Sequence, residues 1–416
     1  MTEESASSCA LRHAFVWLFL ANAVGVLLAL LLCIPQVGVF LGELTYGRWV
    51  PVHLNWQLYG WTSLPLIAWL FSVYEMDRSP SASSWGRKAV ALWSLALVSL
   101  AASCLMGQTS GKIFLDWKGL SLGVFLFAQV VLWISLERAF RANRSRWQGS
   151  AFLWRLVVLI GLLVVPVSLW FASSPRTYPP IDPSTGGPTG ASLLGSTLIV
   201  VAMMLLLPRT LVLGAETGGE ARHGRWLVCL WAVEFLIFLL LEWRGGTHRE
   251  WEQIGGLALL IPWVIIIPRW WRGFVWPEGS AYWLRAVLCW WAALVITGWL
   301  EFLPGVLDRM KFTNGLVAHS HLAMAGFTSS YVLLLSVALG GKDWAWNLRR
   351  GATWWHAAVG GYVVVMLLCG WWEGMEYSWM TEMPLWRQFF YGIRLLFGVT
   401  MAVVSWQWWW SANRRD

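Results

Sequence analysis

Long apolar stretches, separated by short charged or Pro/Gly-rich gaps, follow one another along almost the whole chain. An α-helix needs about 20 residues to cross roughly 30 Å of hydrocarbon. Twelve stretches reach or approach this length: residues 14–40, 52–74, 88–106, 119–138, 151–172, 191–214, 225–243, 252–268, 281–303, 316–339, 353–372 and 386–410. The pattern therefore predicts an all-α integral membrane bundle of about twelve helices, formed by residues 1–416 as one transmembrane domain.

The composition points to the same class of protein. Hydrophobic residues make up 58% of the 416 residues and charged residues only 12%, which excludes an ordinary soluble domain and a disordered chain. The 36 tryptophans exceed what one water-soluble core needs. We expect most of them, including Trp354, Trp355 and Trp408, to form belts at the two membrane surfaces.

The distribution of Lys and Arg predicts the orientation. With an even number of spans both termini lie on one side, and the gaps on that side hold 18 of the 30 basic residues, against nine in the opposite gaps. The positive-inside rule then favours cytoplasmic termini in a bacterial-type inner membrane. The N-terminal segment 1–10 is polar and slightly acidic, so we predict no cleaved signal peptide. The basic surplus is explained by topology, and no nucleic-acid partner is expected. The Pro/Gly-rich segment 173–190 is expected to form a shaped outer loop, such as a lid.

Three of the seven histidines share one predicted depth. His53 opens the second span, and His319 and His321 open the tenth. Both even-numbered spans enter from the outer side, so the three imidazoles fall near the outer surface. The other four histidines are elsewhere: His13 is in the N-terminal tail, His223 and His248 are in gaps, and His356 is near the inner end of the eleventh span.

The H-x-H spacing has a geometric consequence. Residues i and i+2 of an α-helix point about 200° apart, so His319 and His321 are poorly placed to share one metal ion. They can instead present one imidazole to each of two haems, with His53 as the second axial ligand of one of them. A bis-histidine haem suits electron transfer, and a haem with one protein ligand keeps an open position. Two alternatives remain, namely hydrogen bonds between helices and a proton or ion path.

These segments carry a family resemblance. The resemblance is carried by the twelve spans, by Arg48-x-x-x-x-His53-x-Asn55 at the second and by Ala318-His-Ser-His-Leu-Ala-Met-Ala-Gly326 at the tenth. In these segments the chain resembles subunit I of the haem-copper oxidases, nearest to the cbb-type oxidases and the large subunit of nitric oxide reductases. Residues 107–116 are similar to a segment of those branches, with Ile113 at an acidic position. The resemblance implies that His53 and His321 ligate a low-spin haem b, and that His319 ligates a second, high-spin haem.

The resemblance breaks down at the second metal. The family binds copper or non-haem iron through histidines of its sixth and seventh spans, whereas residues 191–214 and 225–243 contain none. We therefore expect no normal copper centre. The alternatives are a working terminal oxidase or nitric oxide reductase with an atypical metal site at Glu234, Glu242 or His248, and a proton-coupled transporter.

Further charged residues are candidates for supporting roles. Arg48, Arg387 and Arg394 flank the outer ends of spans, where they can bind haem propionates or serve as interfacial anchors. Lys112 and Asp116 can contact propionates or a cation, although a plain exposed loop is the simpler expectation. The expected function is transfer of electrons from a cytochrome c-type or quinol donor, in company with other respiratory-complex subunits, and any enzyme activity would be that of an oxidoreductase.

Overall fold

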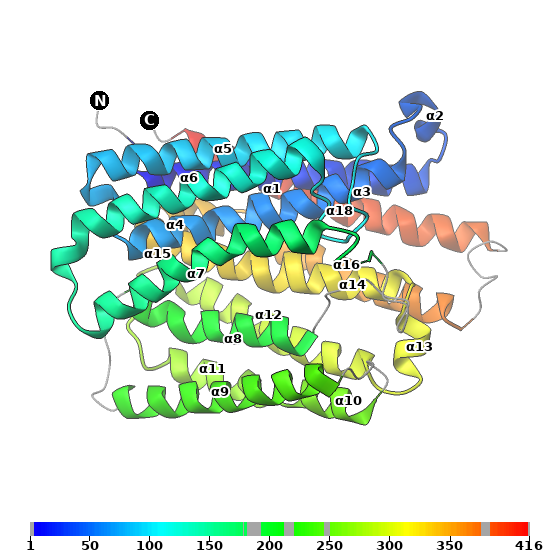
Figure 1. Ribbon diagram of the computed structural model, residues 1–416. Coiled ribbons are helices and arrows are strands. Elements are labelled where there is room, and N and C mark those ends of the chain that lie inside the picture. Colours follow the sequence, from blue (N-terminus) through cyan, green and yellow to red (C-terminus); the bar gives the residue numbers. More distant parts are fainter. Residues whose placement is uncertain are drawn as a thin grey trace. The chain divides into compact units, whose positions relative to one another are not determined.

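The computed structural model describes residues 4–177, 179–180, 193–211, 220–244, 250–375 and 383–414. Within these ranges the regular elements are helices, and no strand occurs (Figure 1). Ten of the described helices are long and apolar enough to cross a membrane. The protein is thus an all-α membrane protein.

The chain divides into two compact units. The first comprises Met1–Asp182, Trp346–Trp355 and Leu395–Asp416, and the second comprises Pro183–Ala345 and His356–Arg394. Each unit is described by itself, and the prediction of one domain over residues 1–416 stays a prediction.

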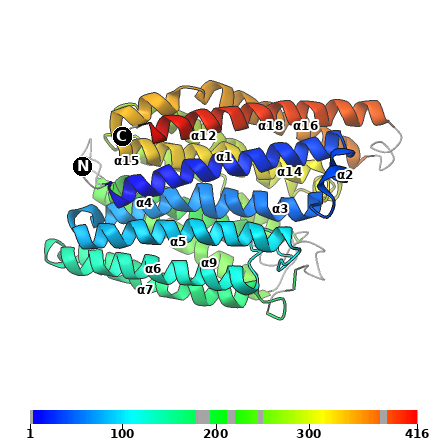
Figure 2. The same cartoon turned by 90° about the horizontal axis from the view of Figure 1, so that it is seen from above.

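The first unit consists of helices packed next to their chain neighbours. In order they are α1 (Ala6–Cys33), α2 (Val37–Leu41), α3 (Tyr46–Asn55), the π-helical turn η1 (Trp56–Thr62), α4 (Ser63–Val73), η2 (Met76–Arg78), α5 (Pro80–Leu105), α6 (Gly119–Asn143), η3 (Arg144–Arg146) and α7 (Ser150–Ser173). Figure 2 shows α6 between α5 and α7, and both pairs are in contact. The helix α1 packs against α3, η1 and α4.

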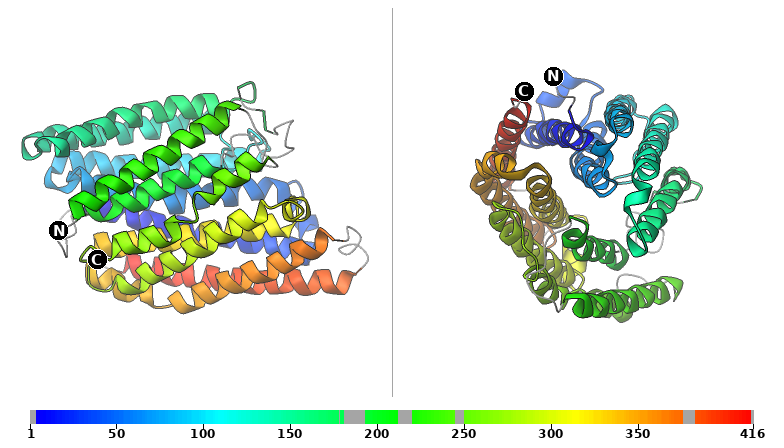
Figure 3. Two further views of the ribbon diagram at one scale, coloured as in Figure 1. Left: turned by 90° about the horizontal axis from the view of Figure 1, so that it is seen from below. Right: turned by 90° about the vertical axis from the view of Figure 1, so that its left-hand side faces the viewer.

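The second unit contains the remaining helices, coloured green to orange in Figure 3. They are α8 (Leu193–Thr210), α9 (Glu220–Arg244), α10 (Trp251–Ala258), α11 (Trp263–Trp271), α12 (Ala281–Glu301), α13 (Val306–Met310), α14 (Asn314–His321), the π-helical turn η4 (Leu322–Thr328), α15 (Ser329–Arg349), α16 (Ala352–Glu373) and α18 (Pro384–Asn413), of which the last three continue into the first unit. Helix α12 contacts α14 and η4, and this packing positions two of the candidate histidines.

Helix ends differ from the predicted spans where proline intervenes. The first helix covers Ala6–Cys33 instead of residues 14–40, because Pro35 lacks an N–H and restricts the residue before it. His13 therefore lies inside α1 and not in a tail, and its Nδ1 lies 2.8 Å from Ser94 Oγ. Its expected place in a tail was wrong.

The count of twelve spans stays a prediction. The second predicted span is divided among α3, η1 and α4. The sixth corresponds to α8, in which residues 194–210 form a shorter apolar helix. The eighth is split into α10 and α11, where Pro262 begins the second piece.

Some tryptophans expected in the surface belts belong to the core. Trp355 and Trp408 are each 1% exposed, and their rings lie 5.2 Å apart. Trp408 Nε1 also donates a hydrogen bond to the Arg350 carbonyl oxygen at 2.7 Å. Trp354, by contrast, is exposed. Adjacent tryptophans on one helix face different surroundings, so a run of Trp does not by itself mark a belt.

Candidate functional site

The His53 imidazole is fixed by α1. Its Nδ1 lies 2.8 Å from the carbonyl oxygen of Ala21, and because a carbonyl only accepts, Nδ1 carries the proton and donates it. The lone pair of the ring is then on Nε2, the nitrogen that a metal would take. Gly25, one turn further along α1, packs directly against the ring, since a Cβ there would lie only 2.9 Å from His53 Cε1.

His321 has a similar local arrangement on a different helix. Its Nδ1 lies 2.8 Å from the carbonyl oxygen of Val317, one turn earlier in α14, and donates to it. The ring stacks on Tyr362 of α16, with centroids 4.2 Å apart and an angle of 26° between the planes. Its lone pair is also on Nε2, so this imidazole too has the tautomer of a metal ligand.

His319 faces another helix, as the i, i+2 spacing predicts. Its Nδ1 lies 3.5 Å from Glu301 Oε2 at the end of α12, which is an ion-pair distance and not a hydrogen bond. Gly298 lies against the same ring, because a Cβ there would be 3.1 Å from His319 Cε1. His319 therefore contacts α12 whereas His321 contacts α16.

The carboxyl group of Glu301 is buried with an incomplete set of hydrogen bonds. The residue is 9% exposed, and its Oε1 is buried with no hydrogen-bond partner among the described residues. Burying a carboxyl group without hydrogen bonds is costly. Such a cost is tolerated at sites where a later contact or a proton uses the group.

A π-helical turn follows each candidate. The turn η1 begins at Trp56, three residues after His53, and η4 begins at Leu322, directly after His321. Single π-helical turns in α-helices occur often at functional sites. Here each shifts the helical register within three residues on the C-terminal side of the histidine.

Arg394 contacts Asn314 and the Tyr362 ring. Its Nη1 donates to Asn314 Oδ1 at 3.1 Å, and its Cζ is 5.7 Å from the centroid of the Tyr362 ring. Asn314 in turn donates to Glu373 from its backbone N at 2.7 Å and from Nδ2 at 2.6 Å. This network fixes the start of α14 at Asn314, five residues before its first histidine.

The other two arginines are placed differently. Arg48 Nη1 donates to the Leu105 carbonyl oxygen at 2.9 Å and lies 3.4 Å from Glu43 Oε2. Arg387 is in the first turn of α18. Their contacts with haem propionates stay a prediction.

The loop after α5 is not the exposed loop that was expected. Asp116 and Lys112 are each only 5% exposed, so this expectation was wrong. Asn55 Nδ2 donates to Asp116 Oδ2 at 2.8 Å, and Lys112 Nζ donates to backbone carbonyls at the end of α7, among them Ser174 at 3.3 Å. Burial raises the pKa of Asp116 to about 6, although the Asn55 hydrogen bond opposes the rise. Burial also lowers the pKa of Lys112.

The candidates for an atypical second metal do not converge in the described residues. Glu234 is buried and accepts a hydrogen bond from Trp263 Nε1 at 2.6 Å, whereas Glu242 is exposed. His248 lies outside the described residues, as does most of the proposed lid at 173–190. Within the described part of the chain, no group of three or more His, Cys, Asp or Glu side chains is arranged to hold a metal ion.

The remaining histidines have ordinary partners or fall outside the description. The Nδ1 of His356 accepts a hydrogen bond from Trp290 Nε1 at 3.0 Å. The side chain of His223 is outside the described part of the structure.

Sequence reasoning missed Glu301, Tyr362 and the glycines that contact the imidazoles. The sequence signal for Glu301 is weak, because it lies near the end of the apolar run 281–303, where flanking carboxylates are common. No sequence signal marks Tyr362, Gly25 or Gly298, because their role depends on which helices meet. His53 belongs to the first unit and His321 to the second, so ligation of one haem by both stays a prediction.

Comparison with models of protein families and with curated protein sequences finds no match.

Proposed function

We propose that this protein is a membrane-embedded haem b protein of the respiratory-oxidase type. His53 and His321 would ligate a low-spin haem, and His319 would ligate a second haem. The observation that carries the proposal is the arrangement of the H-x-H pair, in which His319 and His321 face different helices, α12 and α16. One helix can thus serve two haems.

The local geometry fits haem iron. His53 and His321 each donate Nδ1–H to a backbone carbonyl at 2.8 Å, which leaves Nε2 as the basic nitrogen and limits rotation of the ring. A haem with two histidine ligands exchanges single electrons, and a haem with one keeps a position for a small molecule.

Side chains around the histidines would orient the imidazoles and balance the charge of the proposed haems. Glu301 lies against His319 Nδ1 and would raise the basicity of that imidazole. Tyr362 stacks on His321, and Arg394 lies within 5.7 Å of the Tyr362 ring. Since a guanidinium binds carboxylates through paired hydrogen bonds, Arg394 is the best placed of the three arginines for a propionate.

The wider proposal follows the expectations from the sequence. The electron donor would be a cytochrome c-type protein or a quinol, the protein would act with other respiratory subunits, and it would lack a normal copper centre. The absence of histidine from residues 191–214 and 225–243 supports the last point. We propose an inner membrane of bacterial type with cytoplasmic termini, supported by the Lys and Arg distribution.

One observation favours a second candidate function. A buried carboxyl group against a half-buried imidazole, Glu301 and His319, is also what a proton path in a membrane uses. A proton-coupled transporter is therefore the alternative. The atypical oxidase site receives less support, because Glu234 is bonded to Trp263 and Glu242 is exposed.

A spectrum separates these functions. Protein purified in mild detergent should show the reduced-minus-oxidised bands of haem b, and extraction should give two haems per chain. Carbon monoxide added to the reduced protein should shift the bands of one haem only. Protein with full helix content but no haem, even after expression with added haem precursor, would overturn the haem proposal and favour the transporter.

A further inference from the structure

A cationic cluster surrounds one tryptophan where α5 begins and α6 ends, in the first unit. The Nζ of Lys88 lies 5.1 Å from the centroid of the Trp85 ring, and the Cζ of Arg138 lies 4.7 Å from the same ring. Both distances are within the range of cation–π attraction. One indole ring thus holds two positive charges close together, against their mutual repulsion.

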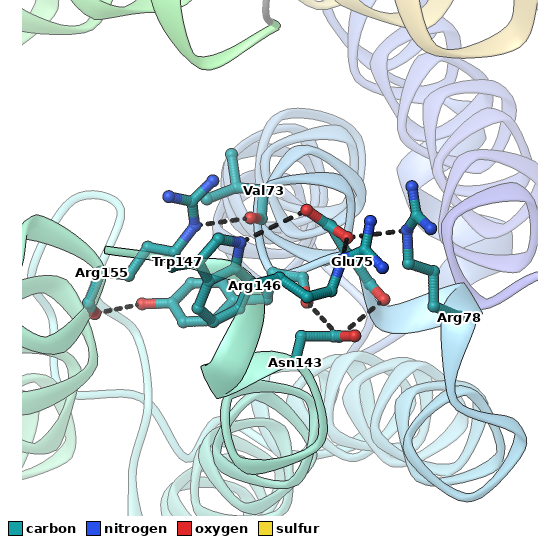
Figure 4. Close-up of polar contacts among 8 residues, drawn as sticks. Val73, Glu75, Arg78, Asn143, Arg146, Trp147 and Arg155 are labelled. Atoms are coloured by element: carbon teal, nitrogen blue, oxygen red, sulfur yellow. Dashed lines mark hydrogen bonds and ion pairs between the residues drawn. The ribbon is translucent and has the colours of Figure 1, made fainter. Parts of the chain in front are cut away.

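Neighbouring arginines at this end of the unit are neutralised by the protein. Glu75 Oε2 lies 2.7 Å from Arg78 Nε and 3.0 Å from Arg146 Nε (Figure 4). Arg141, on the turn after Arg138, forms an ion pair with Glu137. Each of these cations has a carboxylate partner.

Lys88 and Arg138 differ from these neighbours. Both are exposed, and among the described residues neither has a carboxylate within ion-pair distance. Their charge is therefore available to a ligand outside the protein. Since both α5 and α6 are long and apolar enough to span a membrane, the charges lie where the helices leave the hydrocarbon.

We propose that Trp85, Lys88 and Arg138 form a binding site for the headgroup phosphate of an anionic membrane phospholipid, such as phosphatidylglycerol. The lipid supplies the missing anion, because a phosphodiester accepts hydrogen bonds from both a guanidinium and an ammonium group. The half-buried indole suits the headgroup layer, where its apolar ring meets the acyl chains. The ring also keeps the two cations in place before binding, which lowers the entropic cost. The proposal does not depend on the haem assignment.

Two double variants with the same change in charge test the site. K88Q/R138Q removes the two cations on Trp85, and R78Q/R141Q removes two exposed cations that have carboxylate partners. Native mass spectrometry of the purified full-length protein, titrated with phosphatidylglycerol or with zwitterionic phosphatidylcholine, measures how many lipids are retained. Each interfacial cation contributes about 1 kcal/mol, or roughly a fivefold attraction, so K88Q/R138Q should bind phosphatidylglycerol roughly 10- to 30-fold more weakly.

The outcomes are distinct. The proposal requires that the R78Q/R141Q variant bind phosphatidylglycerol as tightly as the unmodified protein does. It also requires that phosphatidylcholine bind equally weakly to the unmodified protein and to K88Q/R138Q. An equal loss in both double variants would show diffuse attraction of charge and would overturn the site. An unchanged affinity of K88Q/R138Q for phosphatidylglycerol would also overturn the proposal. Release of the bound lipid by millimolar inorganic phosphate would overturn it as well, because it would show a site for the phosphate ion and not for a lipid. A W85L variant with unchanged helix content should also lose affinity.

Discussion

Replacing Gly25 with alanine tests how the His53 imidazole is held. The new methyl group would lie 2.9 Å from His53 Cε1 and 3.3 Å from Nδ1. Carbon atoms in contact prefer about 3.5–4.0 Å, so the ring has to move by about 0.6 Å. A move of that size away from α1 stretches the 2.8 Å contact with Ala21 to the limit of a hydrogen bond.

If His53 ligates the proposed haem, the strain falls mainly on the haem-bound state. An imidazole without metal can turn away from the methyl group, whereas an imidazole bound to iron through Nε2 is fixed. Overpacking of this kind costs about 1–3 kcal/mol, which corresponds to roughly 5- to 150-fold weaker haem binding. Alanine also favours the helix at Gly25 by up to about 1 kcal/mol, but it does so with and without haem, so this gain does not offset the loss of affinity.

The assay measures the low-spin haem signal per protein and the rate of haem transfer to a high-affinity acceptor apoprotein. Gly161→Ala in α7 is the matched control, because a Cβ there meets nothing within 4 Å. It should leave the spectrum and the transfer rate unchanged. A Gly25→Ala protein with the spectrum and transfer rate of the unmodified protein would refute His53 as a ligand held against α1.

Three further predictions concern single side chains. His53→Ala or His321→Ala should abolish the low-spin signal and leave carbon monoxide binding, whereas His319→Ala should do the reverse, and spectra that keep both signals in all three variants would disprove the assignment. Glu301→Gln removes the charge beside His319 at nearly constant volume, so resonance Raman spectra should show the iron–histidine vibration of the reduced high-spin haem at lower frequency, with the low-spin bands unchanged as the internal control. Burial raises the pKa of Asp116 from 3.8 to about 6. Ionisation of Asp116 therefore lowers the free energy of unfolding, beginning near pH 4 and reaching about 2–3 kcal/mol above pH 6. Asp116→Asn should therefore raise the unfolding temperature at pH 8, with a gain that shrinks as the pH falls toward 4, and an equal gain at both pH values would contradict the burial argument.

The apolar pattern alone predicts the fold class, because a membrane helix must satisfy its own backbone hydrogen bonds. The places where it fails have local causes. Pro35 ends α1 before the apolar run is over, and the π-helical turn at Trp56–Thr62 divides the second predicted span. Hydropathy reports the preference of side chains for an apolar solvent and carries no information on the backbone hydrogen-bond register. A window average therefore cannot detect a π-helical turn inside an apolar run.

The site is predictable in part, for a similar reason. Helical periodicity alone separates the directions of His319 and His321, and the structure places them against different helices. The partners are a different matter. Ala21 contributes only a backbone carbonyl, which every residue has, and Gly298 contributes only the absence of a side chain. Neither role can be predicted from the type of residue at that position.

Glu301 shows where charge patterns mislead. At the end of the ninth apolar run, a carboxylate resembles the interfacial residues that flank many membrane helices, and such residues normally remain in water. Packing of α12 against α14 instead buries it beside His319. Removing a carboxyl group from water without a hydrogen bond for Oε1 opposes folding, so Glu301 costs stability that an apolar residue at this helix end would not. This cost is the physical reason for placing the proposed second haem site at His319.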